Sequence, residues 1–105
     1  MKRFKTTVTR IDEYIIEIDD NELNEQWMDD FRHVFFPFYE YDEHAEQLAQ
    51  MRARFGEGFI EGYGNVLIDG RKPWHITDEN QVNKAINIKI ISEDNDCDVE
   101  VEEIE

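Results

Sequence analysis

The chain has 105 residues, of which 26 are acidic and 11 are basic, and its formal net charge is -15. This length fits one domain, residues 1–105, that can form its own hydrophobic core. The charge argues against direct binding to nucleic acid, which needs clustered Lys and Arg, and against binding to an anionic membrane surface. Regularly spaced aromatic residues argue against disorder, although acidic chains are often disordered.

The single cysteine, Cys97, excludes an internal disulfide and is typical of a reducing compartment. The sequence contains no run of 18 apolar residues, and its start has no signal-peptide pattern. We therefore expect a soluble, cytoplasmic protein.

Two strands are predicted at the start of the chain. In residues 3–8 the side chains of Phe4, Thr6 and Val8 fall on one face, and residues 13–18 alternate in the same way. Residues 10–13 are either a short hairpin turn or the middle of one long bent strand. We favour the hairpin, although no Asn-Gly or Asp-Gly pair marks it.

A first helix is predicted after the polar residues 19–21, any of which can cap it. Its apolar residues recur at helical spacing, and Pro37 ends it because the residue before proline avoids the helical region. The apolar residues are Leu23, Trp27, Phe31, Val34 and Phe35. The opposite side carries carboxylates, at Glu22, Glu25, Asp29 and Asp30.

The link that follows holds four aromatic residues, Phe36, Phe38, Tyr39 and Tyr41. They either cover the core between the two helices or remain partly exposed as a contact surface.

The central stretch, residues 42–64, predicts a helix, a glycine stop and a strand. Asp42 is positioned to cap the helix, and Gly56 supplies the left-handed residue that closes its last turn. Residues 59–63 alternate with bulky apolar groups on both faces, which predicts an inner strand. The remaining glycines of this stretch fit close strand packing better than a phosphate-binding loop, because their spacing matches no nucleotide motif.

The last third of the chain predicts further strands. Residues 66–68 lead into Asp69-Gly70, a strong turn signal, and Pro73 keeps the returning arm short. After a polar loop at residues 77–84, a final pair of strands joined at residues 92–96 is expected. Its inward residues are Ile86, Ile88 and Ile90 on the first strand and Cys97, Val99 and Val101 on the second. The predicted fold class is α+β, an antiparallel sheet of about four to five strands packed against two helices in a ββααβββ-like order.

No catalytic, cofactor-binding or metal-binding residue is predicted. Asp94, Asp96, Asp98 and Glu105 match part of a calcium-loop pattern, but the position that requires glycine is Val99. The three histidines are too widely separated for a local zinc motif. Acidic neighbours of Cys97 disfavour its thiolate, so a catalytic cysteine is not expected.

The acidic surface has two interpretations, a solvated face that keeps the protein soluble or a mimic of a nucleic-acid backbone. Side chains on one strand face recur every ~6.6 Å, whereas duplex DNA carries one charge per ~1.7 Å of its axis, so one acidic strand is about fourfold too sparse in charge. Mimicry therefore requires the acidic side of the first helix to lie beside the acidic C-terminal strand. The predicted contact residues are Glu22, Glu25, Asp29, Asp30, Glu93, Asp94, Asp96, Asp98, Glu100 and Glu102.

Three segments, TVTRIDEYIIEID, EHAEQLAQMRARFGEGFIEGYG and INIKIISEDNDCDVEVEE, together resemble a family of short accessory proteins from phages and prophage regions. The resemblance covers most of the chain, and the RARFGEGFIEGYG segment is its most specific part. The family implies no activity and no catalytic residues. It implies a phage accessory protein acting in the bacterial host cytoplasm, a class that includes anti-CRISPR and anti-restriction inhibitors.

The leading hypothesis is therefore a non-enzymatic inhibitor whose partner is a basic, nucleic-acid-handling host protein. One alternative is an immunity or antitoxin-like partner of a toxin, with the aromatic link as its contact. Another is a structural or morphogenetic phage protein, which a self-associating edge strand would indicate.

Overall fold

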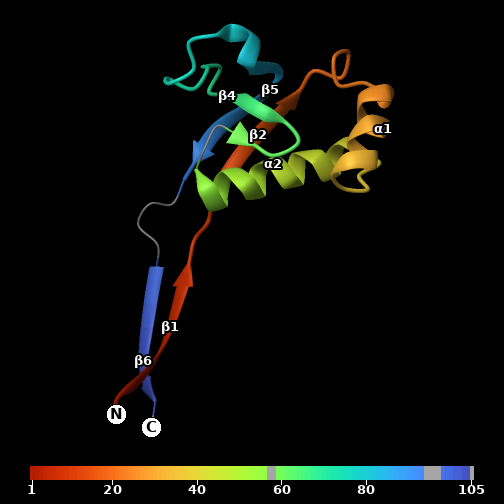
Figure 1. Ribbon diagram of the computed structural model, residues 1–105. Helices are drawn as coiled ribbons and strands as arrows, with labels where there is room; N and C mark the ends of the chain where they lie inside the picture. The colour runs from red at the N-terminus through yellow and green to blue at the C-terminus, as the bar shows by residue number, and fades with distance from the viewer. Residues whose placement is uncertain (57–58, 94–97, 105) are drawn as a thin grey trace.

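The computed structural model describes residues 1–56, 59–93 and 98–104 (Figure 1). It confirms the α+β class, with the element order ββααββββ in place of the expected ββααβββ. The strands are β1 (Arg3–Thr9), β2 (Glu13–Ile18), β3 (Phe59–Ile60), β4 (Gly64–Ile68), β5 (Val82–Ser92) and β6 (Asp98–Ile104). The helices are α1 (Glu25–Val34), α2 (Tyr41–Phe55) and a short 3-10 turn, η1 (Glu79–Gln81).

Four strands form the main sheet in the order β2-β5-β4-β3. Strand β5 runs antiparallel to β2 but parallel to β4, so the expectation of a purely antiparallel sheet is wrong. The Asp69-Gly70 turn forms as predicted, but its returning arm is a single bridge between Ile68 and Arg71. The chain then returns through η1 to start β5 beside the beginning of β4, which makes the pair parallel.

The core lies between this sheet and the helices, with α2 across one face (Figure 1). Leu48 of α2, Val66 of β4 and Ile86 and Ile88 of β5 are completely buried. Ile86 and Ile88 therefore face inward as predicted, and Ile90 is half-buried. Helix α1 adds Met28 and Phe31 to the buried residues.

The ends of the helices differ in part from the sequence prediction. Helix α1 begins after Asn24, whose side chain accepts a hydrogen bond from the Trp27 N–H, and not after residues 19–21. Helix α2 begins with a capping box formed by Glu40 and Glu43 instead of an Asp42 cap. Gly56 closes α2 in the left-handed conformation, as predicted.

The prediction of an inner strand at residues 59–63 is wrong. Strand β3 contains two residues and lies at the edge of the sheet, because the chain turns at Glu61 to Tyr63. Gly62 adopts φ +89° in this turn, a conformation that favours glycine. The turn directs Tyr63 into the core instead of continuing the ladder.

Strands β1 and β6 form a separate two-stranded sheet, here called the ribbon, that projects from the rest of the molecule (Figure 1). Both predicted hairpins are therefore wrong, since β1 pairs with β6 while β2 and β5 pair with each other. The ribbon makes the molecule elongated, with a radius of gyration of 17.5 Å, compared with about 13 Å for a compact chain of this length. Val99 and Val101 are 57% and 64% exposed, so the prediction that they face inward is also wrong. Cys97 lies outside the described residues.

Candidate functional site

The predicted acidic contact residues fall into groups that the fold keeps apart. Glu22 and Glu25 lie at the start of α1, and Asp29 and Asp30 lie within it. Asp98, Glu100 and Glu102 lie on β6, at the opposite end of the molecule (Figure 1). Asp94 and Asp96 lie outside the described residues. The arrangement that duplex mimicry requires, with α1 beside the C-terminal strand, is not present.

Other carboxylates lie where the chain leaves β2 and where both helices begin, and two of them, Asp20 and Asp42, line the same shallow hollow. We call this region the acidic end, and all of its members are exposed. It consists of Asp19, Asp20, Glu22, Glu25 and Asp42. Sequence analysis missed the contribution of Asp19, Asp20 and Asp42 to a surface, because the first two were interpreted only as helix caps and the third belongs to the other helix.

Tyr41 joins the two helix starts at the acidic end. Its hydroxyl donates a hydrogen bond to the Leu23 carbonyl oxygen over 2.7 Å, which fixes the start of α2 against the segment before α1. Desolvation raises the pKa of Tyr41, and the negative charges of Asp20 and Glu25 raise it further. Tyr41 also lines one shallow hollow with Asp20 and Asp42.

The charge of the acidic end is not neutralised by ion pairs among the described residues. Within residues 1–56, 59–93 and 98–104, no ion pair involves any of its five carboxylates. Farther along α1, Asp29 is 3.4 Å from Arg32, so it is partly compensated. The negative charge of the acidic end, which includes Glu22 and Glu25 of the predicted contact set, can therefore attract a basic partner.

Glu93 is part of the fold. Its carboxylate accepts hydrogen bonds from Arg52 Nε and Nη2 over 3.2 and 2.9 Å and from the Tyr14 hydroxyl over 2.6 Å. The Arg52 hydrogen bond is the main cause that lowers the pKa of Glu93. Burial, with the adjacent Glu93, raises the pKa of Tyr14 to about 12. This network joins α2 and β2 to the residue that follows β5, so the Glu93 carboxylate is engaged internally.

Replacing Glu93 with glutamine is expected to lower the free energy of unfolding at pH 7 by about 1–2 kcal/mol, because it removes a bidentate charged interaction with Arg52. Urea denaturation measures the change. Glu100→Gln removes the same charge from the exposed face of β6 and is the matched control, expected to change stability by less than about 0.5 kcal/mol. Equal effects of the two substitutions would contradict a structural role for Glu93.

The aromatic link combines both predicted roles. Phe38 packs against the core, and Tyr41 is half-buried. Phe36 and Tyr39 are 43% and 64% exposed, and Val34 and Phe35 at the end of α1 are also exposed. We call the four exposed side chains, Val34, Phe35, Phe36 and Tyr39, the apolar link. They can contact a partner without unfolding of the core.

A buried histidine, His44, packs against Phe38 of the aromatic link. His44 is 1% exposed and packs among the rings of Trp27, Phe31 and Phe38. Its Nδ1 is 2.8 Å from the Tyr63 hydroxyl, and its buried Nε2 has no hydrogen-bond partner among the residues that the structure describes. Burial lowers the pKa of His44, so the ring is held neutral inside the aromatic cluster.

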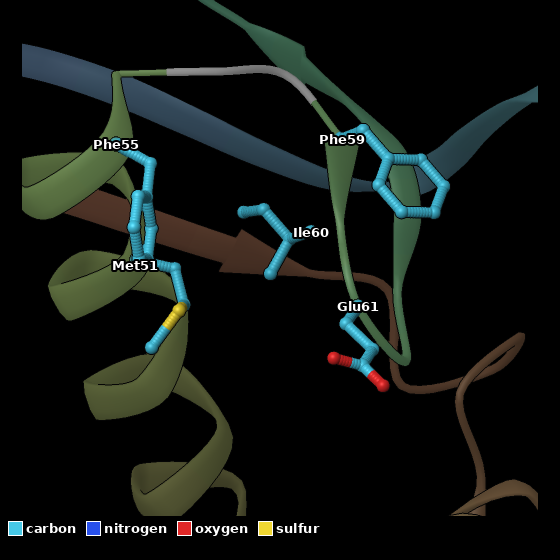
Figure 2. A pocket seen from close by; sticks show the side chains of 5 residues that line it. All are labelled: Met51, Phe55, Phe59, Ile60 and Glu61. Carbon is cyan, nitrogen blue, oxygen red and sulfur yellow. The ribbon is translucent and has the colours of Figure 1, made fainter.

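Figure 2 shows a hollow of about 470 Å³ between the end of α2 and β3. Its lining residues are Met51, Phe55, Phe59, Ile60 and Glu61. Ile60 points from β3 toward α2, whereas the Phe59 ring points away from α2, as strand alternation requires (Figure 2). Among the described residues of this lining, Glu61 is the one titratable side chain, and the other four are apolar.

A second hollow, of about 500 Å³, shares Phe59 with the first. Its lining includes Arg71 and Lys72, together with Trp74, which is 94% exposed. Sequence analysis missed this combination of cations and aromatic rings, because Arg52 and Phe59 of the same lining lie far from Trp74 along the chain.

Among the described residues, no three His, Cys, Asp or Glu side chains are grouped so that they could hold a metal ion. In the same part of the chain, every helix is too short or too polar to cross a membrane. Comparison of the chain with protein-family models, curated proteins and solved structures finds no match.

Proposed function

We propose that the protein is a non-enzymatic phage accessory protein that binds and blocks a basic, nucleic-acid-handling protein of the bacterial host. The acidic end is its contact surface. The observation that supports this proposal is the group of five exposed carboxylates at the end of β2 and the starts of both helices, where Tyr41 joins α2 to the segment before α1.

The expected contact differs from duplex mimicry along the whole molecule. The carboxylates of α1 and β6 are at opposite ends, so they do not form one continuous row (Figure 1). A local cluster instead occupies one basic cleft and excludes nucleic acid from it. Such binding is steered by charge, so its association rate is expected to fall as salt screens the field over a Debye length of about 8 Å.

The proposal is tested by the plating efficiency of phage on strains that carry CRISPR or restriction systems and express the protein. The test variant is the quadruple substitution Asp20→Asn, Glu22→Gln, Glu25→Gln and Asp42→Asn. It is expected to lose protection of the phage and to lose capture of the defence protein from lysate at low salt. Near-isosteric amides should leave the fold intact, which circular dichroism verifies.

The matched control neutralises four carboxylates on the ribbon, through Asp98→Asn, Glu100→Gln, Glu102→Gln and Glu103→Gln. Net charge changes equally in both variants, so any general effect of charge on solubility is the same. Protection retained by the control and lost by the test variant supports the acidic end as the contact. Equal loss in both variants would indicate a diffuse electrostatic effect, and no protection by the unmodified protein in any defence strain would count against the inhibitor proposal.

A second candidate function, a partner of one cognate toxin, is favoured by the apolar link. Large exposed apolar side chains beside a charged surface are typical of a specific mixed interface. The double substitution Phe36→Ala and Tyr39→Ala is expected to abolish toxin binding without unfolding, since both side chains are exposed. Retained binding in this variant, with salt-sensitive affinity, would favour the purely electrostatic contact.

A further inference from the structure

The two faces of the ribbon differ in chemistry. Cross-strand pairing places Val8 opposite Val99, Thr6 opposite Val101 and Phe4 opposite Glu103, all on one face. The other face pairs Lys5 with Glu102 and carries most of the ribbon's charge. A strand pair that alternates in this way is typical of a sheet with one face buried.

That face is not buried by the described residues. Phe4, Val8, Val99 and Val101 are 53%, 62%, 57% and 64% exposed. A two-stranded sheet is only marginally stable in water unless a third layer or strand supports it. The ribbon is therefore an amphipathic element whose covering layer is missing from the described part of the monomer.

We propose that a second copy of this chain covers the apolar face, so that two ribbons pack face to face in a symmetric dimer. A twofold axis perpendicular to the strands and lying between the ribbons makes them antiparallel. In that arrangement Phe4 of each copy lies over the smaller Val8 of its partner, and Val101 lies over Val101. A parallel dimer would instead put Phe4 over Glu103, whereas the antiparallel dimer puts Glu103 over Val99 and gives the larger Phe4 an apolar partner.

Charge also favours the antiparallel dimer. Residues 10–93 contain nineteen acidic and eight basic residues and carry a formal charge of -11, which makes two such bodies repel each other. Antiparallel ribbons hold the bodies at opposite ends of a seven-residue strand pair, which is about 23 Å long, or more than two Debye lengths in physiological salt.

The β6 edge of the ribbon is poorly suited to a symmetric dimer. Antiparallel pairing of two β6 edges about Val101 would place Glu100 of each copy opposite Glu102 of its partner. Like charges placed opposite each other in this way destabilise edge-to-edge pairing. Pairing of two β1 edges would leave the apolar face exposed in both copies, so only face-to-face packing covers it.

The expected dimer is weak. Two faces of this size bury roughly 1,000 Å² in total, which is at the low end for specific interfaces. Dimerisation is expected to strengthen as salt is raised, because salt screens the repulsion between the acidic bodies. This salt dependence is opposite to that expected for binding of a basic partner at the acidic end.

Sedimentation velocity of the full chain, from micromolar to millimolar concentration at low and high salt, tests the proposal. The quadruple variant Phe4→Thr, Val8→Thr, Val99→Thr and Val101→Thr keeps the net charge and strand propensity, and it is expected to weaken dimerisation by roughly a hundredfold or more. The control Lys5→Thr with Glu102→Thr, on the opposite face, keeps the net charge and should dimerise like the unmodified protein.

A strict monomer at all concentrations would overturn the proposal, and so would a control variant that loses dimerisation as fully as the test variant. An open series of larger species would also overturn it, since it would indicate β1-to-β6 edge pairing instead of a closed face-to-face dimer. Dimerisation that strengthens with salt and is lost only in the apolar-face variant supports it.

Cross-linking provides a second measurement that does not depend on affinity. In a background with Cys97→Ser, Thr6→Cys lies at the centre of the apolar face, where each copy meets its counterpart under the proposed symmetry. It is expected to form a disulfide-linked dimer readily under mild oxidation. Lys5→Cys, on the opposite face, is the control, and equal cross-linking of both variants would contradict the proposed packing.

Discussion

Replacing Gly62 with alanine is expected to lower the free energy of unfolding by about 3 kcal/mol or more. Gly62 has φ +89°, which an alanine adopts only with strain. A Cβ at this position would also lie 2.7 Å from Cε2 of Phe31. Phe31 cannot move away easily, because it is 4% exposed and packs against Trp27, Phe35 and Tyr63.

The matched control is Gly64→Ala. Gly64 has φ +86°, but among the described residues a Cβ there would have no heavy atom within 4 Å apart from its chain neighbours, so this substitution adds backbone strain without the clash. Thermal denaturation should show the difference, since 1 kcal/mol corresponds to about 4–8 °C for a domain of this size. Adding Phe31→Leu to Gly62→Ala should be less destabilising than the sum of the single changes, because it removes the ring atoms that clash. Similar losses for Gly62→Ala and Gly64→Ala would contradict the close contact.

Lowering the pH from 7 to 5 is expected to destabilise the protein through His44, by up to about 1.4 kcal/mol per pH unit. Burial lowers the pKa of His44 in the folded protein, whereas the unfolded chain takes up this proton near its ordinary value of about 6.5. Below that value the unfolded state binds more protons than the folded state. The contribution of neutral His44 to stability is therefore fully present above pH 6.5. It is lost as the pH falls toward the lowered pKa of His44 in the folded protein.

The substitution His44→Gln removes this titration while keeping a group that can hydrogen-bond to Tyr63, so the slope of stability against pH should flatten between pH 7 and 5. His33→Gln, at an exposed position, is the control and should keep the slope of the unmodified protein. Glu93 also has a lowered pKa, but it loses stabilising charge only at more acidic pH, so the two effects are separable. An unchanged slope in His44→Gln would show that other groups cause the pH dependence.

Local patterns predicted the helices and turns well. The apolar spacing around Phe31 and Leu48 identified the two helices, Gly56 identified the end of α2, and Asp69-Gly70 identified a tight turn. Each of these features depends on residues within a few positions of one another. The helix caps were less accurate, because Asp19, Asp20, Asn21 and Asn24 are all suitable cap residues and the sequence does not distinguish among them.

Strand pairing was predicted poorly, and the candidate site depended on it. The hairpin prediction for the first two strands rested on their closeness in sequence, but β1 pairs with the far end of the chain. The acidic contact set depended on the same unknown, since it joined α1 to β6, which lie at opposite ends of the molecule (Figure 1). Glu93 was placed in that set because nothing in its neighbourhood indicates that Arg52 and Tyr14 approach it from distant elements.

The sequence by itself determined the α+β class, the positions of the helices, the acidic character of the surface and the alternation that gives the ribbon one apolar face. Only the tertiary structure decided which strands pair, which carboxylates meet at the acidic end and that the apolar face of the ribbon is left exposed. The physical reason is that helical and strand periodicity is set by neighbouring residues, whereas a sheet partner is selected by packing between segments far apart in the chain.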